Sequence, residues 1–221
     1  VLGGFRLRVG GVEITSLPRK AKALLARLSL RDEPPISRES MSDLLWTDRG
    51  TEQARHSLRQ SLLVLRRTFK DAGTDDILTN DSRTLGFIPD KVTTDLDRFR
   101  RLANSTERSE LAEAVSLYTG PLLAGFPGVA RDFDDWLDEV RGALAETALA
   151  AMGRLADAAS ADGDTDVAVL IAERMAQIDP LREDSHRRVM RLMAMAGRRS
   201  EALRYYAEAT ARLKAELNIP P

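Results

Sequence analysis

Apolar side chains recur with the period of an α-helix between residues 51 and 71. Leu58, Leu62, Leu65 and Phe69 follow one another at i, i+4, i+7 and i+11, which is the spacing of a single helical face. At roughly 100° per residue, these side chains fall within about 60° of one another around the helix axis. The pattern therefore predicts an amphipathic helix whose apolar face packs in a core.

Weaker patterns before this helix predict a hairpin and two shorter helices. Residues 5–14 alternate apolar and polar side chains around a Gly-Gly turn, which predicts a β-hairpin. Residues 19–30 carry apolar side chains at helical spacing, and Ser37 is the expected N-cap of a helix that ends at Trp46. We expect Ile36, just before that helix, to form a one- or two-residue bridging strand.

The segment after the long helix predicts a wing. Residues 77–79 and 85–88 are rich in apolar side chains and are joined by a polar turn, which is the pattern of two short paired strands. The order hairpin, helix, strand, helix, loop, helix, hairpin is typical of a winged helix-turn-helix. In that fold the second helix of the motif reads the major groove of DNA. The fold class is therefore expected to be mainly α with small β-hairpins.

The remainder of the chain is expected to be an all-helical domain. Helical apolar spacing, broken by Gly and Pro, covers residues 96–103, 109–118, 133–160, 165–178, 183–196 and 200–217. When the chain is shifted by 34 residues, Gly163 falls on Gly197, and the same shift aligns apolar or small residues on both sides. The aligned pairs are Leu155 with Val189, Ala159 with Met193, Ala168 with Ala202, Ala172 with Tyr206 and Met175 with Ala209. A period of 34 residues predicts a tetratricopeptide (TPR)-like array.

Basic charge is concentrated around the long helix. Residues 49–70 hold six Lys and Arg against one acid, a local net charge of +5 in a chain whose total is −1. Residues 1–70 carry +7, residues 71–97 carry −5 and residues 98–221 carry −3. This distribution is expected of a nucleic-acid-binding module joined to an acidic domain. An ordinary surface helix with a solvated charged face is the alternative.

Polar side chains on the exposed side of the long helix are of the types that bind DNA. Arg59 and Gln60 lie in its N-terminal half, where bidentate hydrogen bonds to base edges are expected. Arg66 and Arg67 are expected to pair with phosphates of any sequence. The complete set of expected DNA-binding residues is Arg38, Arg55, His56, Arg59, Gln60, Arg66, Arg67, Lys70 and Arg83.

Motifs for catalysis or cofactor binding are missing from the sequence. It contains no cysteine, no zinc-protease or nucleophile-elbow motif and no Walker-type phosphate loop. Of the two histidines, His56 lies on the expected DNA face and His186 is expected to be a surface residue. The methionines expected to pack between helices, with a Met-rich binding groove as the alternative, are Met175, Met190, Met193 and Met195. We therefore expect no enzyme activity, no cofactor and no metal.

Composition favours a cytoplasmic protein. No apolar run approaches the ~20 residues of a membrane span, no signal peptide opens the chain, and the lack of cysteine fits a reducing compartment. No membrane partner is expected.

Several segments resemble one known family. FRLRVGG, ISRESMSDLLW, ARHSLRQSLLVLRRTF and LGFIPDKVTTDLDRF are similar to the OmpR/PhoB-type DNA-binding domain of the Streptomyces antibiotic regulatory protein (SARP) family. Leu-Trp at residues 45–46, Arg-Arg at 66–67 and Gly-Phe at 86–87 stand where that family ends its positioning helix, closes its recognition helix and marks its wing. Pro89 stands where the wing usually has an aliphatic residue. YTGPLLAGFPGVARDFDDWLDEVRGAL resembles the start of the bacterial transcriptional activator domain that follows the winged helix in SARP-type regulators.

The resemblance implies two domains and a role in transcription. It implies a winged-helix DNA-binding domain over residues 1–94 and a TPR-like bacterial transcriptional activator domain over residues 95–221. It further implies a nucleoid-associated activator that binds double-stranded promoter DNA at direct repeats as a pair of protomers. RNA polymerase holoenzyme would be recruited by the activator domain and by the loop Thr47, Asp48, Arg49, Gly50 and Thr51.

Two other functions stay open. In a protein-interaction adaptor, the winged helix would no longer read DNA and the repeats would hold a protein partner. The chain begins at Val1 without Met and ends at Pro221, so it is alternatively a regulatory fragment of a larger multidomain protein such as an enzyme or ATPase. The segment after the wing has no Gly- or Ser-rich linker, which predicts that the helical array docks on the winged helix and presents a groove to a protein partner.

Overall fold

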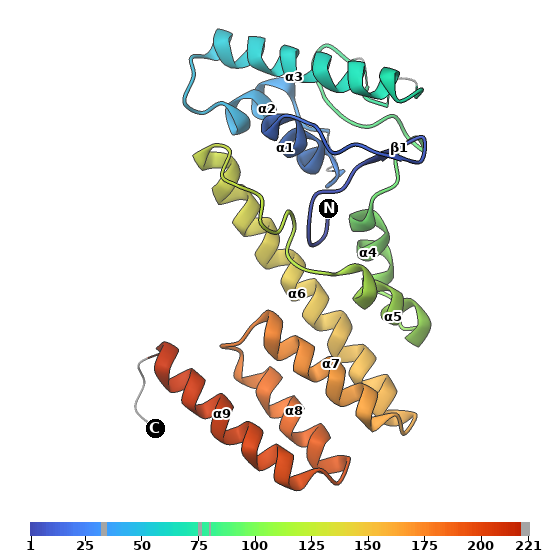
Figure 1. Ribbon diagram of the computed structural model, residues 1–221, viewed down its shortest axis with the longest axis vertical. Coiled ribbons are helices and arrows are strands. Elements are labelled where there is room, and N and C mark those ends of the chain that lie inside the picture. The colour runs from blue at the N-terminus through green and yellow to red at the C-terminus, as the bar shows by residue number, and fades with distance from the viewer. Residues whose placement is uncertain (32–34, 75–76, 80, 218–221) are drawn as a thin grey trace. The chain divides into compact units, whose positions relative to one another are not determined.

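The N-terminal part of the chain is a bundle of helices with a β-hairpin at its start. The computed structural model describes residues 1–31, 35–74, 77–79 and 81–217. In chain order, the elements of this part are β1 (Arg8–Val9), β2 (Val12–Glu13), α1 (Arg19–Leu28), α2 (Arg38–Leu45) and α3 (Thr51–Asp71), shown in Figure 1. The antiparallel pairing of β1 with β2 confirms the predicted first hairpin.

The start of α2 has the predicted cap. The Ser37 hydroxyl accepts a hydrogen bond from the Ser40 amide at 2.9 Å, which satisfies one of the backbone donors that a helix start leaves free. Ser37 itself bridges to Thr84. The Ile36 carbonyl accepts from the Leu85 amide at 2.9 Å. The bridging residue therefore lies one position later than predicted, because Ser37 both pairs with Thr84 and caps the start of α2.

The wing is thinner than two full strands. Leu78 pairs with Phe87 in an isolated antiparallel bridge, and the Thr79 amide donates to the Gly86 carbonyl at 2.9 Å. Together with the helices α1 to α3, this pairing makes the N-terminal part a winged helix-turn-helix.

Helix α3 is fixed by its apolar face. Leu58, Leu62, Leu65 and Phe69 are all buried, as the sequence predicts. Truncating a buried side chain of this size to Ala costs about 2–5 kcal/mol. The rotational setting of the helix, and thus the direction of its polar side chains, is determined by this packing.

Contacts divide the chain into two compact units. Unit 1 comprises residues 1–98 and 117–144, and unit 2 comprises residues 99–116 and 145–221. The helices that contribute residues to both units are α4 (Asp95–Ala103), α5 (Arg108–Leu117) and α6 (Arg131–Ala161). The predicted domain division between residues 94 and 95 stays a prediction.

Unit 1 therefore contains a segment that lies far beyond the winged helix in the sequence. Leu2 bridges to Leu122, and the Thr119 hydroxyl donates to the Leu2 carbonyl at 2.9 Å. The Arg27 guanidinium of α1 lies over the Trp136 ring at 5.1 Å, a cation–π contact. Residues 117–144 thus pack as part of the same core as the first residues of the chain.

Unit 2 is a stack of antiparallel helices. Besides residues 99–116, it contains residues 145–161 of α6, followed by α7 (Thr165–Ile178), α8 (Glu183–Met195) and α9 (Arg199–Leu217), and Figure 1 shows these C-terminal helices side by side. Gly163 and Gly197 have φ of +85° and +75°, a conformation that glycine adopts without strain. In both turns the amide after the glycine donates to the carbonyl five residues earlier at 2.9 Å, which is the Schellman helix end. Identical turns 34 residues apart confirm the TPR-like repeat.

Two predictions for unit 2 are wrong. His186 is buried, with Nδ1 2.9 Å from the Tyr205 hydroxyl and Nε2 2.8 Å from the Pro180 carbonyl. Met195 is exposed instead of packed between helices. His186 is buried because α9 brings a hydroxyl partner to a helical position that would otherwise be solvated.

Candidate nucleic-acid interface

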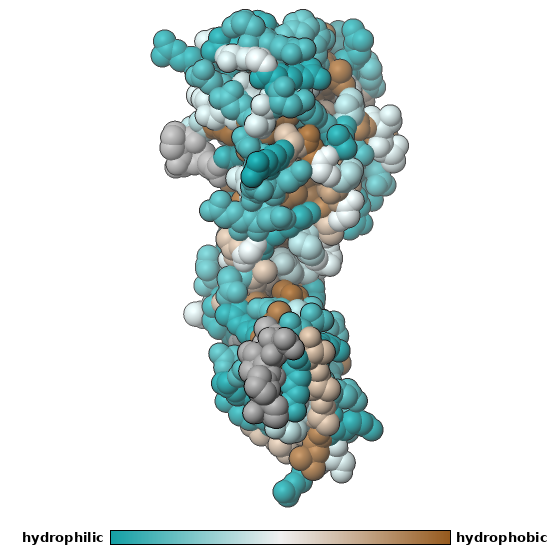
Figure 2. Space-filling model, turned by 90° about the vertical axis from the view of Figure 1, so that its left-hand side faces the viewer, coloured by the Kyte–Doolittle hydropathy of each residue, from teal (hydrophilic) through white to brown (hydrophobic). Residues whose placement is uncertain are grey.

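The exposed side of α3 carries most of the residues predicted to bind DNA. The exposed members are Arg55, His56, Arg59, Gln60, Arg67 and Lys70. Figure 2 shows that the end of the molecule where α3 lies is predominantly hydrophilic on the face in view. Leu63 is an exception on this helix, because it is apolar and 53% exposed.

The basic side chains of the middle and end of α3 are available to a ligand. Arg59, Arg67 and Lys70 make no side-chain hydrogen bond or ion pair with any of the described residues. Three uncompensated positive charges on one exposed helix repel one another. They therefore favour a bound polyanion.

Arg55 differs because it is already paired. Its guanidinium contacts Glu52 at 3.0 Å and Glu39 at 3.2 Å. All three side chains are well exposed, and exposed pairs of this kind contribute only about 0–1 kcal/mol. These carboxylates can therefore give way to a phosphate.

A depression of about 700 Å³ lies between the start of α2, the first half of α3 and the turn of the wing. Its basic lining residues are Arg38, Arg55, Arg59 and Arg83. The structure thus brings together four predicted DNA-binding residues from three separate segments.

Asp81 holds the turn of the wing in place. Its carboxylate accepts hydrogen bonds from the Thr84 hydroxyl and from the amides of Arg83 and Thr84, the two amides at 3.1 Å. The Thr84 hydroxyl and these amides lower the pKa of Asp81 below its usual value. The Asp81 carbonyl accepts from Arg38 Nε at 2.9 Å, which ties the turn to α2.

Arg38 and Arg66 are less exposed than the other predicted residues. Burial lowers the pKa of Arg38, the positive charge of Arg66 lowers it further, and Asp81 opposes both effects. Arg66 Nη2 lies 3.5 Å from the Thr79 carbonyl of the wing. These two guanidinium groups therefore join the helices to the wing as well as adding positive charge.

The loop predicted to contact polymerase is exposed along its whole length. Residues 47–51 lead into α3, and Arg49 Nη1 donates to the Ser57 hydroxyl at 2.8 Å. Trp46, just before the loop, is buried, and Lys20 lies over its ring at 5.1 Å. The loop thus starts from a fixed point on the bundle.

A second arginine-rich surface escaped the sequence interpretation. In unit 2, Arg154 and Arg188 line a pocket of about 620 Å³. The two residues are 34 positions apart, so they occupy equivalent places in the repeat. Searching the repeat for matching charges, as well as matching apolar residues, would have found them.

Among the described residues, no three His, Asp or Glu side chains are placed together to hold a metal ion. None of the helices in the described ranges combines the length and apolar character that crossing a bilayer requires.

A winged helix-turn-helix whose exposed basic helix is α3, followed by a TPR-like array, defines a class of bacterial transcriptional regulators. Residues 94–221 match the bacterial transcriptional activator domain, and the chain belongs to this family.

Curated relatives span the whole chain. It is 28% identical to the transcriptional regulatory protein MoaR1 of Mycobacterium tuberculosis, covering 74% of that protein. It is 29% identical to the regulatory protein AfsR of Streptomyces coelicolor, of which it covers 22%. The relatives of this chain are thus regulators of the SARP type, and several are much longer than the chain.

A solved structure has the same fold. The structure of Mycobacterium tuberculosis EmbR in complex with a low affinity phosphopeptide has a TM-score of 0.75 at 24% identity, and all of this chain aligns with 60% of the EmbR chain. The chain therefore spans less than two thirds of that protein.

Proposed function

We propose that the chain is a transcription activator that binds promoter DNA sequence-specifically through α3 and the wing. The observation that carries this proposal is the contrast between the two sides of α3. One side is locked in the core, and the other presents Arg59, Arg67 and Lys70 without partners among the described residues.

Base reading falls to the N-terminal half of α3. Arg59 and Gln60 are exposed there, and both side chain types make bidentate hydrogen bonds to base edges in the major groove. Arg55 and His56 assist near the helix start. Leu63 adds an apolar contact of the kind that a thymine methyl group makes.

Phosphate contacts fall to the flanks of the site. Arg67 and Lys70 follow along α3, and Arg38, Arg66 and Arg83 lie where α2 and the wing meet it. Phosphate contacts set the position of a protein on the duplex and contribute most of the salt-dependent affinity.

Activation needs partners beyond DNA. We infer from the resemblance to SARP-type regulators that a pair of protomers binds direct repeats. RNA polymerase holoenzyme is then recruited by the helical domain and the loop of residues 47–51. In this function the protein acts in the nucleoid without a cofactor and without catalysis.

Electrophoretic mobility shifts on genomic fragments test the proposal. The whole chain should bind duplex DNA, and Arg67→Ala should weaken binding to all fragments alike. Arg131→Ala is the matched control, because this arginine is 89% exposed and lies outside α3 and the wing. If the whole chain binds no fragment at low salt, the proposal fails and the adaptor function is favoured.

A further inference from the structure

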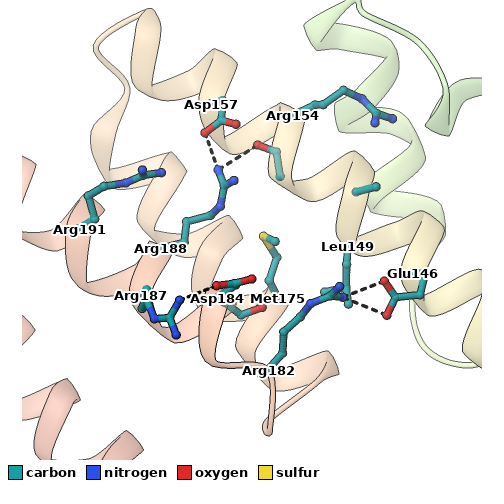
Figure 3. A pocket seen from close by; sticks show the side chains of 13 residues that line it. Glu146, Leu149, Arg154, Asp157, Met175, Arg182, Asp184, Arg187, Arg188 and Arg191 are labelled. Atoms are coloured by element: carbon teal, nitrogen blue, oxygen red, sulfur yellow. Dashed lines mark hydrogen bonds and ion pairs between the residues drawn. The ribbon is translucent and has the colours of Figure 1, made fainter.

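The pocket of about 620 Å³ in unit 2 lies between α6 and α8, with α7 behind it. Figure 3 shows Arg188 of α8 reaching toward Asp157 of α6, and Arg182, just before α8, reaching toward Glu146 of α6. Its arginines are Arg154, Arg182, Arg187, Arg188 and Arg191, and its acids are Glu146, Asp157 and Asp184. Arg154 donates to the Ala103 carbonyl, and Arg187 pairs with Glu183 and Asp184. The lining is thus net positive, although residues 98–221 together are net negative.

Two ion pairs cross the pocket and join Arg182 and Arg188 to α6. Arg182 contacts both carboxylate oxygens of Glu146, at 2.9 and 3.0 Å, and Arg188 contacts Asp157. The carboxylates are 61% and 60% exposed. Breaking these ion pairs and exposing the carboxylates to water therefore costs little free energy.

Other polar groups of the pocket lack a partner. The Ser185 hydroxyl is buried in the wall, with a residue exposure of 2%, and has no hydrogen-bond partner among the described residues. Arg191 makes no ion pair within the same ranges. A buried hydroxyl without a partner is destabilising.

Apolar side chains complete the lining. Leu149 of α6 and Met175 of α7 lie among the charged groups. Arginines beside an apolar floor suit a peptide that carries several carboxylates.

We propose that this pocket binds an acidic peptide segment of a partner protein. The peptide carboxylates replace Glu146 and Asp157 as the partners of Arg182 and Arg188, and the released carboxylates become solvated. This site is separate from the DNA-binding face of α3 and goes beyond the proposed function.

Fluorescence anisotropy of a labelled hexaglutamate peptide on the whole chain tests this site. At low ionic strength, where screening is weakest, Arg188→Ala should weaken binding about tenfold, because a charge-assisted hydrogen bond is lost. Glu146→Gln should strengthen binding several-fold, because it removes a carboxylate that competes for Arg182. A gain of affinity cannot arise from unfolding, so this variant keeps the test valid if Arg188→Ala folds poorly.

Controls separate this site from α3. Each variant is also titrated with duplex DNA, and hexaglutamine replaces hexaglutamate as the uncharged peptide. Arg188→Ala should leave DNA binding unchanged, and Arg67→Ala should leave peptide binding unchanged. The proposal is overturned if Glu146→Gln binds hexaglutamate no more tightly than the wild type, if hexaglutamine binds as tightly, or if Arg67→Ala weakens peptide binding as much as Arg188→Ala.

Discussion

The two arginine-rich surfaces of this chain differ in how their guanidinium groups are partnered. On α3, Arg59 and Arg67 extend from a helix with no ion-pair partner among the described residues. In unit 2, Arg182 and Arg188 are held by carboxylates of the facing helix. The same residue type therefore serves two purposes. Unpaired arginines are suited to a long polyanion, whereas paired arginines hold helices together and accept only a ligand that replaces their carboxylates.

The largest expected effect is on DNA binding. Changing Arg59 and Arg67 together to Ala should lower affinity for the cognate site by a factor on the order of 100, because one base contact of about 1–3 kcal/mol and one phosphate contact are lost. Anisotropy with labelled duplex DNA measures the loss. The matched double variant Arg182→Ala with Arg188→Ala should bind DNA like the wild type, and an equal loss there would mean that the two surfaces are not distinct.

Gln60→Ala should weaken binding to the cognate site more than binding to random duplex DNA. Loss of a bidentate contact to a base should weaken the cognate complex by about 1–3 kcal/mol, or roughly tenfold to a hundredfold. Binding to random duplex should change little. Equal weakening on both sequences would show that Gln60 does not read a base.

The free energy of unfolding should depend more on the arginines of unit 2 than on those of α3, the opposite of DNA affinity. Arg188→Ala removes the contact with Asp157 and the 3.4 Å hydrogen bond to the Gly153 carbonyl. The Arg188 side chain is 24% exposed, so we expect the free energy of unfolding to fall by about 1 kcal/mol. Arg67→Ala should change it by less than about 0.5 kcal/mol. Urea denaturation of both variants gives the comparison, and a larger loss for Arg67→Ala would contradict it.

The smallest expected effect is a pH dependence of the wing. The pKa of Asp81 is lower in the folded protein than its usual value, so its hydrogen bonds stabilise the turn fully above the usual carboxyl pKa. That stabilisation is lost as pH falls from the usual value through the lowered one. An NMR titration of the Thr84 amide should show this transition, and Asp81→Ala should abolish it. An unchanged titration in the variant would assign it to another group.

Local pattern was enough to predict α3, since one buried face of Leu58, Leu62, Leu65 and Phe69 sets its period. The wing is paired over a short length in the described residues: Leu78 bridges to Phe87, and hydrogen bonds join Thr79 to Gly86 and Ile88 to Ile77 on either side. A pairing this short leaves little alternation in the sequence.

Long-range partners explain the other differences. His186 was predicted to be exposed because nothing near it in sequence shows that Tyr205 will bond its ring. Arg182 and Arg188 have the composition of a solvated helix face, and their partners in α6 lie 36 and 31 residues earlier in the chain. The residues predicted to bind DNA were easier to group from the sequence, because they share one exposed helix or flank it; their contact with DNA stays a prediction.

The salt dependence of duplex DNA affinity, measured in parallel for the wild type and Arg67→Ala, tests the central claim most directly. We predict that the logarithm of the wild-type association constant falls steeply and linearly with the logarithm of salt concentration, by about 0.9 for each phosphate neutralised. The slope for Arg67→Ala should be shallower by about 1. A wild-type affinity that does not change with salt, or identical slopes for the two proteins, would contradict the assignment of the α3 surface to DNA.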